Sequence, residues 1–194
     1  AGCAGSATNS CEKDMNTQLG ISIPTYQRPE QLRRCLLSVI EAARAHDVPI
    51  TVLDDSGDDT NLSTVQEMQG AYSLIHYIRH EENIGIDRNI LASVDACPCD
   101  YVWLLGEDDR LVPEAVSEML RVLKQAPDFV FANYSTVNED VSIVLKEQAL
   151  PLQNDVEQSA SEFLAQHGWA PGFIGGCVVK KQLWSAVEQK PYIG

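Results

Sequence analysis

PITVLDDSGDD, residues 49–59, decides the fold class of this protein. Its first half is a short apolar run with β-branched residues, and its second half is a cluster of acidic and turn-forming residues. This pattern predicts a buried strand that ends abruptly in polar side chains. In open α/β sheets ligands bind at the carboxyl ends of the strands, so we expect a functional site at this end.

On both sides of this strand, short apolar runs alternate with amphipathic segments. The further predicted strands are residues 19–24, 72–78, 101–105 and 128–132; the predicted helices are residues 29–45, a segment from Leu62 to a stop at Gly70, a segment from Ile84 to before Pro98, and residues 113–125. This alternation predicts the α/β class, with a mostly parallel central sheet and helices on both faces.

Beyond Tyr134 the pattern is less regular. Residues 137–145 are compatible with a hairpin or a mobile loop. Residues 155–166 predict a helix, residues 173–179 a strand interrupted by glycines, and residues 181–188 a last helix. We expect one domain over residues 19–194, preceded by a small, polar segment 1–18 that is poorly ordered or is a remnant outside the folded protein.

The charge balance excludes some classes of function. There are 28 Asp and Glu against 14 Lys and Arg, a formal net charge of −14. A nucleic-acid-binding protein carries a basic stripe, and anionic lipid attracts basic segments, so neither partner is favoured. The apolar runs are strand-length, which predicts no transmembrane helix, and the first residues do not resemble a signal peptide.

The six cysteines and four histidines predict neither disulfides nor zinc. Cys97-Pro98-Cys99 is a single close pair without a second pair or a nearby histidine, so free thiols are the favoured interpretation, and metal or redox chemistry is the alternative. His76 and His80 flank a strand-like run, where their spacing does not bring them together. A reducing cytosol is the expected environment.

Two acidic clusters fall at predicted strand ends, Asp54-Asp55 and Glu107-Asp108-Asp109. Neighbouring carboxylates repel each other unless a cation or a hydrogen-bond donor balances them. Asp58 has an alternative role as a helix cap, whereas Asp108 and Asp109 come too early to cap the helix at Pro113. Hard oxygen ligands of this kind suit Mg²⁺ or Mn²⁺, which commonly take one or two carboxylates and complete their shell with phosphate oxygens and water.

Phosphate-binding motifs of other nucleotide sites are missing from the sequence. No GxGxxG follows the first strand and no GxxxxGK[ST] occurs. The charge of a diphosphate would therefore be neutralised chiefly by the metal. The segment NIGIDRN, residues 83–89, is an unusual polar opening to a helix; Asn83 as a helix cap with Arg88 exposed is its alternative interpretation.

Four segments in this order resemble glycosyltransferase family 2, which has the GT-A fold. They are ISIPTYQRP (21–29), DDSGD (54–58), NIGIDRN (83–89) and WLLGEDD (103–109). A weaker similarity lies in Gly175-Gly176. The GxDRN spacing and the Gly-x-Asp-Asp form are most similar to bacterial O-antigen glycosyltransferases of the abequosyltransferase-like kind. The resemblance implies a Rossmann-like three-layer sandwich that handles nucleoside-diphospho-sugars.

The resemblance also implies roles for individual residues. The nucleotide-sugar would be bound by Pro24, Thr25, Tyr26, Asp55, Arg88 and Asp108, with Asp55 reading the base. Asp109 would be the main Mn²⁺ or Mg²⁺ ligand, and Asp108 would contact the ribose or the metal. Gly106 stands where the family often has a first DxD aspartate, which leaves more of the metal binding to Asp109.

The implied reaction is inverting transfer, in which a metal stabilises the leaving nucleoside diphosphate and a carboxylate base deprotonates an acceptor hydroxyl. In the family this base follows a segment like residues 173–176. After Gly176 the sequence has one carboxylate, Glu188, so we expect the base beyond Gly194 and a catalytic domain truncated at its C-terminus. Trp169, Gly175 and Gly176 would lie on the acceptor side.

The predicted function is therefore a metal-dependent glycosyltransferase for bacterial cell-surface polysaccharide. Its donor is a nucleoside-diphosphate sugar and its acceptor a saccharide or lipid-linked saccharide. We expect it in the cytoplasm, in at most peripheral contact with the inner membrane face. The alternatives are a nucleotide-sugar-binding fragment without turnover and a receiver-type signalling domain, although the lysine and third aspartate of a receiver are not evident.

Overall fold

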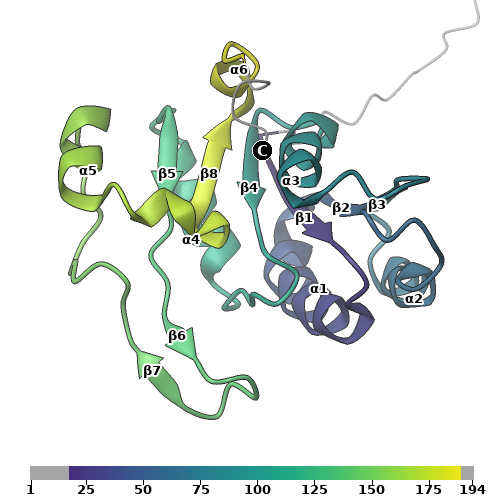
Figure 1. The fold of residues 1–194 in the computed structure, drawn as a ribbon. Helices are drawn as coiled ribbons and strands as arrows, with labels where there is room; N and C mark the ends of the chain where they lie inside the picture. Colours follow the sequence, from purple (N-terminus) through teal and green to yellow (C-terminus); the bar gives the residue numbers. More distant parts are fainter. Residues whose placement is uncertain (1–17, 189–194) are drawn as a thin grey trace, which may run out of the picture.

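A six-stranded sheet in the order β3-β2-β1-β4-β8-β5 forms the middle layer of the computed structural model, which describes residues 18–188 (Figure 1). The strands are β1 (Leu19–Thr25), β2 (Ile50–Asp54), β3 (Ile75–Arg79), β4 (Tyr101–Leu104), β5 (Phe129–Phe131), β6 (Thr136–Val137), β7 (Val144–Lys146) and β8 (Cys177–Lys180). The helices are α1 (Pro29–Ala43), α2 (Leu62–Ala71), α3 (Ile86–Ala96), α4 (Ala115–Leu123), α5 (Ala160–His167) and α6 (Lys181–Trp184), with 3₁₀ turns at Arg44–His46, Ala170–Gly172 and Ile174–Gly176.

The alternating side chains of β1 divide the core between the two faces of the sheet. Leu19, Ile21 and Ile23 face α1, α2 and α4 and belong to the larger buried cluster. On the opposite face, the Ser22 hydroxyl donates to the carbonyl of Ser93 in α3 over 2.6 Å. Val102 and Leu104 of β4 bury against α3 on that same face. This arrangement gives the three layers expected from the sequence.

Parallel pairing brings the carboxyl ends of three strands to one edge of the sheet. In the β1–β2 ladder Thr25 lies opposite Asp54, and in the β1–β4 ladder Ser22 lies opposite Leu104. Beyond this last pair, the backbone N–H of Leu105 donates to the carbonyl of Ser22. The loops that follow β1, β2 and β4 therefore start side by side.

The prediction of a mostly parallel sheet is confirmed, with one exception that the alternation did not indicate. β8 lies between β4 and β5 and is antiparallel to both. The chain reaches β8 after the hairpin β6–β7 and helix α5 (Figure 1). The hairpin interpretation of residues 137–145 is thus the right one, with β6 and β7 paired antiparallel.

Several predicted boundaries were wrong. The third strand starts at Ile75 rather than Tyr72, because Tyr72 ends α2 and its hydroxyl donates to the Val48 carbonyl over 2.8 Å. Helix α5 starts at Ala160 rather than residue 155, because Ser159 and Glu162 form a capping box there.

The C-terminal elements are also shorter than predicted. Residues 174–176 form a 3₁₀ turn, so the last strand begins at Cys177 and not at residue 173. Helix α6 ends at Trp184, four residues before the predicted end. Segments 1–17 and 189–194 lie outside the described residues, so the predicted character of 1–18 stays a prediction.

The described cysteines are free and buried: Cys35, Cys97, Cys99 and Cys177. The sulfurs of Cys97 and Cys99 lie against Gly20, where a Cβ would come within 2.9 Å of the Cys99 sulfur. A Cβ at this second residue of β1 would therefore displace the two sulfurs, which favours glycine there. Among residues 18–188, none of the helices is long and apolar enough to cross a membrane.

Candidate functional site

The loop after β1 is the first wall of the site. Pro24 and Thr25 are buried as the last residues of the strand, and Tyr26 exposes 46% of its surface. Gln27 adopts a positive φ of 51°, which turns the chain sharply into α1. Its backbone N–H donates to the Ser56 hydroxyl over 2.9 Å. The loop is thereby tied to the loop that follows β2.

Asp54, the first aspartate after Leu53, is fully buried and holds Ser56, the residue that ties the loops after β1 and β2 together. Its Oδ1 accepts hydrogen bonds from the Ser56 backbone and from the Asn61 amide, both at 3.0 Å. Its Oδ2 accepts the Tyr77 hydroxyl at 2.7 Å. With both oxygens engaged inside the protein, Asp54 is a structural carboxylate and not one that faces a ligand.

Asp55 holds the segment before α3. Its two carboxylate oxygens accept the backbone N–H groups of Ile84, at 2.7 Å, and Gly85, at 3.0 Å. The Asn83 side-chain amide donates to the Asp55 carbonyl over 3.3 Å. Gly85 has a φ of 89°, so this close approach uses a backbone conformation that favours glycine. Asp55 exposes 2% of its surface, and each of its oxygens accepts one hydrogen bond and so retains one further lone pair.

Arg88 and Asn89, in the first turn of α3, differ in their exposure. Arg88 is exposed at the surface, as the helix-cap interpretation of residues 83–89 also expected. Asn89 is buried, and its amide donates to the Leu53 carbonyl over 3.1 Å. Asn83 is not the helix cap, because that position belongs to Gly85. The Asn89 contact fixes the start of α3 against β2.

The acidic cluster after β4 combines exposed and buried carboxylates. Asp108 exposes 64% of its side chain, whereas Glu107 exposes 12%. Burial raises the pKa of Asp109 to about 6; the backbone N–H of Gly106 opposes this rise and the charge of Asp108 adds to it. Burial also raises the pKa of Glu107, although hydrogen bonds from Thr25 and Tyr26 oppose the change.

Asp109 closes a tight turn. Its backbone N–H donates to the Gly106 carbonyl over 3.0 Å, and its Oδ2 accepts the Gly106 N–H over 3.1 Å. The thiol of Cys35 donates to the same Gly106 carbonyl from beneath, and burial with the neighbouring carboxylates raises the pKa of that thiol. The turn therefore holds the Asp109 carboxylate in one place at the end of β4.

The glycines predicted for the acceptor side lie next to this turn. The Trp103 indole N–H donates to the Gly175 carbonyl over 2.9 Å, and a Cβ on Gly175 would overlap Oδ2 of Asp109. A Cβ on Gly176 would overlap the Phe131 ring. The Trp169 ring is exposed, and the Nζ of Lys146 in β7 lies 5.9 Å from its centroid.

Comparison with known proteins decides the family. The profile described as Glycosyl transferase family 2 matches residues 21–180. The chain belongs to glycosyltransferase family 2. This membership confirms the resemblance of the four motifs and excludes the receiver-domain alternative.

Curated relatives of this family 2 chain include bacterial polysaccharide enzymes. Abequosyltransferase RfbV of Salmonella typhimurium is 26% identical over 91% of this chain and 57% of its own length. GalNAc(5)-diNAcBac-PP-undecaprenol beta-1,3-glucosyltransferase of Campylobacter jejuni is 26% identical over 76% of this chain and 47% of its own length. The chain thus spans about half the length of the curated relatives it matches.

Solved structures show the same fold. TarS residues 1–349 from S. aureus superpose with a TM-score of 0.66 over 87% of this chain and 48% of that chain, at 15% identity. Mannosyltransferase PcManGT from Pyrobaculum calidifontis, solved with GDP-Man and Mn²⁺, gives a TM-score of 0.53 over 59% of this chain and 35% of that chain, also at 15% identity. The predicted GT-A-like α/β fold is confirmed.

Three contributors to this family 2 site were missed by sequence reasoning. Glu107 accepts the Tyr26 backbone N–H over 3.1 Å and so joins the loops after β1 and β4. Asn61 and Asn89 are buried amides that hold strand ends. Glu107 and Asn89 stand inside motifs already singled out, which was a usable signal, but nothing in the local sequence marks Asn61.

Proposed function

We propose that this protein transfers a sugar from a nucleoside-diphosphate donor to a hydroxyl of a saccharide or lipid-linked saccharide, in the synthesis of a bacterial cell-surface polysaccharide. The main support is that Asp55, at the end of β2, and Asp108 and Asp109, after β4, lie at one edge of the sheet in a family 2 chain. Two relatives, an abequosyltransferase and a glucosyltransferase for an undecaprenol-linked saccharide, support this class of donor and acceptor.

In this proposal the nucleotide lies over the loop after β1. Pro24 and Thr25 lie beneath it, and the exposed Tyr26 ring contacts it. Asp55 reads the base with a lone pair that Ile84 and Gly85 leave free. A TarS structure with UDP-GlcNAc supports nucleotide-sugar binding by this fold.

Arg88 and Asp108 complete the donor site in this proposal. Arg88 is exposed in the first turn of α3, where its guanidinium can approach the nucleotide. Asp108, 64% exposed at the end of β4, contacts the ribose or the metal. Both side chains are exposed in the structure.

The carboxylates after β4 fit a divalent metal ion that is shared with the donor. Within residues 18–188, no three His, Cys, Asp or Glu side chains converge as a ready metal cluster. Mg²⁺ and Mn²⁺ commonly use only one or two carboxylates and take the rest of their shell from phosphates and water. Asp109 would be the main ligand and Asp108 the second. Bound there, Mn²⁺ or Mg²⁺ supplies charge that stabilises the leaving nucleoside diphosphate.

Acceptor binding is assigned to the side of β8. Trp169 presents an exposed ring, and Gly175 and Gly176 bring the backbone close to Asp109 and Phe131. We propose inverting transfer with a carboxylate base that follows residue 194 in a longer protein. We also propose that the protein works in the cytoplasm, at the inner membrane face where a lipid-linked acceptor is presented.

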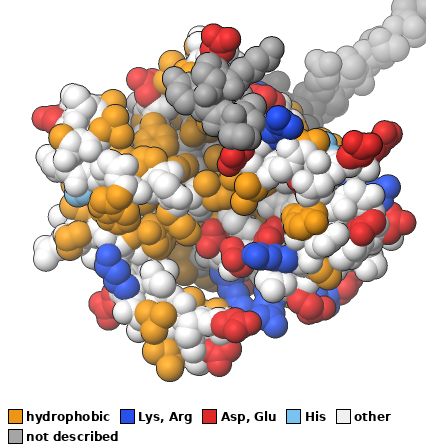
Figure 2. Space-filling model, in the orientation of Figure 1, with side chains coloured by type: hydrophobic (Ala, Val, Ile, Leu, Met, Phe, Trp, Pro, Cys, Tyr) orange, Lys and Arg blue, Asp and Glu red, His pale blue; other side chains and the backbone are white. Residues whose placement is uncertain are grey.

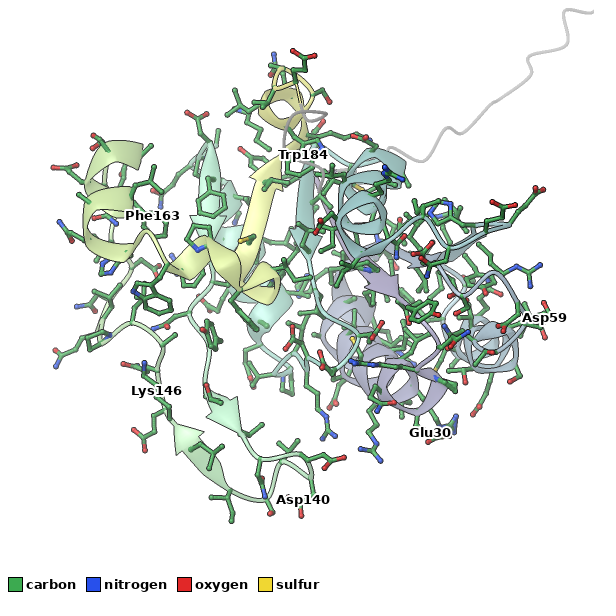
Figure 3. The ribbon with its side chains drawn as sticks, viewed as in Figure 1. Glu30, Asp59, Asp140, Lys146, Phe163 and Trp184 are labelled. Carbon is green, nitrogen blue, oxygen red and sulfur yellow. The ribbon has the colours of Figure 1, made fainter. Side chains whose placement is uncertain are left out.

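Titration calorimetry with UDP-, GDP-, CDP- and dTDP-sugars, with and without Mn²⁺, tests the donor site. We expect one nucleotide-sugar to bind in the presence of Mn²⁺ and Asp109→Ala to abolish the metal-dependent part. The matched control is Asp140→Ala at the tip of the β6–β7 hairpin, whose exposed carboxylate accepts hydrogen bonds from Ser142 (Figure 3).

Each outcome of this titration is decisive. If none of the nucleotide-sugars binds with metal, the proposed function is wrong, and an unchanged affinity in Asp109→Ala refutes the metal assignment. Transfer is measured separately, with a lipid-linked saccharide acceptor. Binding without transfer by residues 1–194, with transfer by a longer chain, would support a base outside this segment.

A further inference from the structure

Arg28 is a cation placed directly against the acidic cluster after β4. It precedes α1 and exposes 54% of its side chain. Its Nη1 lies 3.4 Å from Oε1 of Glu107 and 3.6 Å from Oδ2 of Asp108. The arginine therefore touches one of the two carboxylates assigned to the metal.

The two carboxylates that Arg28 contacts differ: Glu107 is held in place by a further hydrogen bond, whereas Asp108 is exposed to solvent. Glu107 is mostly buried, and its second oxygen accepts the Tyr26 N–H, so its position depends on more than Arg28. Asp108 is largely exposed. A long, exposed arginine can leave such a contact at small cost, because exposed ion pairs contribute little free energy.

The two candidate partners of Asp108 have charges of the same sign. A divalent cation bound at Asp108 would be repelled by the guanidinium, since like charges a few ångströms apart raise the energy. A diphosphate brought in with the donor offers the same guanidinium paired acceptors, because arginine recognises phosphate oxygens in a bidentate manner. Arg28 can therefore lose its contact with Asp108 when the metal binds and gain a contact with the diphosphate.

We propose that Arg28 is a built-in counter-cation: it neutralises Asp108 in the metal-free protein, yields that carboxylate to the incoming divalent cation, and moves to the diphosphate of the donor. This inference rests on the proposed function. Figure 2 shows basic and acidic side chains near each other in the middle of the face in view, and hydrophobic side chains gathered on the side of α5 and β5.

The proposal makes two predictions of opposite sign for Arg28→Gln. Mn²⁺ alone should bind about two- to fivefold more tightly, because a competing charge is gone; this range is that of an exposed ion pair. Nucleoside diphosphate in the presence of a chelator should bind about threefold or more weakly, because a phosphate ligand is gone. A merely structural arginine would weaken both.

The experiment measures Mn²⁺ binding from the free Mn²⁺ signal in electron paramagnetic resonance, and nucleotide binding by calorimetry with EDTA. The nucleotide is whichever of UDP, GDP, CDP and dTDP the unmodified protein binds most tightly with Mn²⁺. Arg28→Lys keeps the charge and should leave the Mn²⁺ affinity close to that of the unmodified protein. Arg33→Gln in α1 is the matched control, because Arg33 pairs with Glu67 of α2 and not with the acidic cluster after β4.

The outcomes separate this inference from the proposed function. If the unmodified protein binds no nucleoside diphosphate with Mn²⁺, the proposed function fails. If it binds one, but Arg28→Gln leaves the Mn²⁺ affinity unchanged or lowers it, or leaves the metal-free nucleotide affinity unchanged, the counter-cation role is overturned. Weakening of both affinities, together with a lower melting temperature, would make Arg28 a clamp for the loop after β1.

Discussion

Gly175 lies so close to Asp109 that a Cβ atom on residue 175 would overlap the Oδ2 of that carboxylate. The same glycine accepts the Trp103 indole N–H, so its backbone is held in place from the sheet. The proposed metal ligand and the proposed acceptor side are therefore in direct contact. A substitution at Gly175 should therefore displace the Asp109 carboxylate.

Gly175→Ala should displace the Asp109 carboxylate and weaken metal-dependent nucleotide binding about tenfold, an overpacking effect of about 1–3 kcal/mol. Calorimetry with Mn²⁺ and the nucleotide measures it. Gly172→Ala is the control, since a Cβ there meets no atom within 4 Å. Equal affinities for the two variants would contradict the link between Gly175 and Asp109.

Asp54→Ala should destabilise the protein by about 2–4 kcal/mol, because the donors of Ser56, Asn61 and Tyr77 lose their buried acceptor. Urea unfolding followed by circular dichroism provides the measurement. Asp58→Ala, which removes an exposed carboxylate from the same motif, should change the midpoint far less. Comparable losses of stability in Asp54→Ala and Asp58→Ala would contradict a structural role that is specific to Asp54.

Gly20→Ala should cost about 1–3 kcal/mol, since the new Cβ meets the sulfurs of Cys97 and Cys99 in a packed core. Adding Cys97→Ala makes room, so the double variant should lose less than the sum of the single variants. Gly70→Ala in α2 has free space and should be neutral or stabilising. Strict additivity of the first two changes would refute the contact.

Asp109→Asn should stabilise the metal-free protein at high pH. Because burial raises the pKa of Asp109 from 3.8 to about 6, the ionised carboxylate costs stability. The cost is absent below pH 3.8, grows between pH 3.8 and about 6, and is complete above that range. Melting in EDTA should show a gain of about 2–6 °C near pH ~8 that disappears near pH ~4.

The groups facing Asp109 support this assignment of the pH range. Asp108 and the Cys35 thiol are its titratable neighbours, and the thiol stays neutral because its own pKa is raised well above the usual value. A gain that persists unchanged at the acidic end of this range would show that the Asp109→Asn substitution improves packing rather than removing a charge.

Much of the fold follows from local patterns in the sequence. Apolar periodicity identified β1, β2, β4 and the helices between them, and turn-forming acidic residues located the strand ends. The antiparallel insertion of β8 could not be predicted this way, because pairing between Trp103 and Val178 depends on which distant segments meet in the sheet. The glycines at 175 and 176 looked like interruptions of a strand, and only their contacts explain the turn.

The α/β class, the order of the motifs, and the presence of carboxylates at the ends of β2 and β4 could be read from the amino-acid sequence, because they depend on residue types and their spacing along the chain. The burial and the hydrogen-bond partners of each carboxylate, in contrast, depend on the tertiary structure. Asp54 accepts hydrogen bonds from four donors, Asp55 from two backbone N–H groups, and Asp109 from the Gly106 N–H of its turn, whereas Asp108 is exposed beside Arg28. Burial and partners arise from folding in three dimensions, and they separate residues that look alike in the sequence.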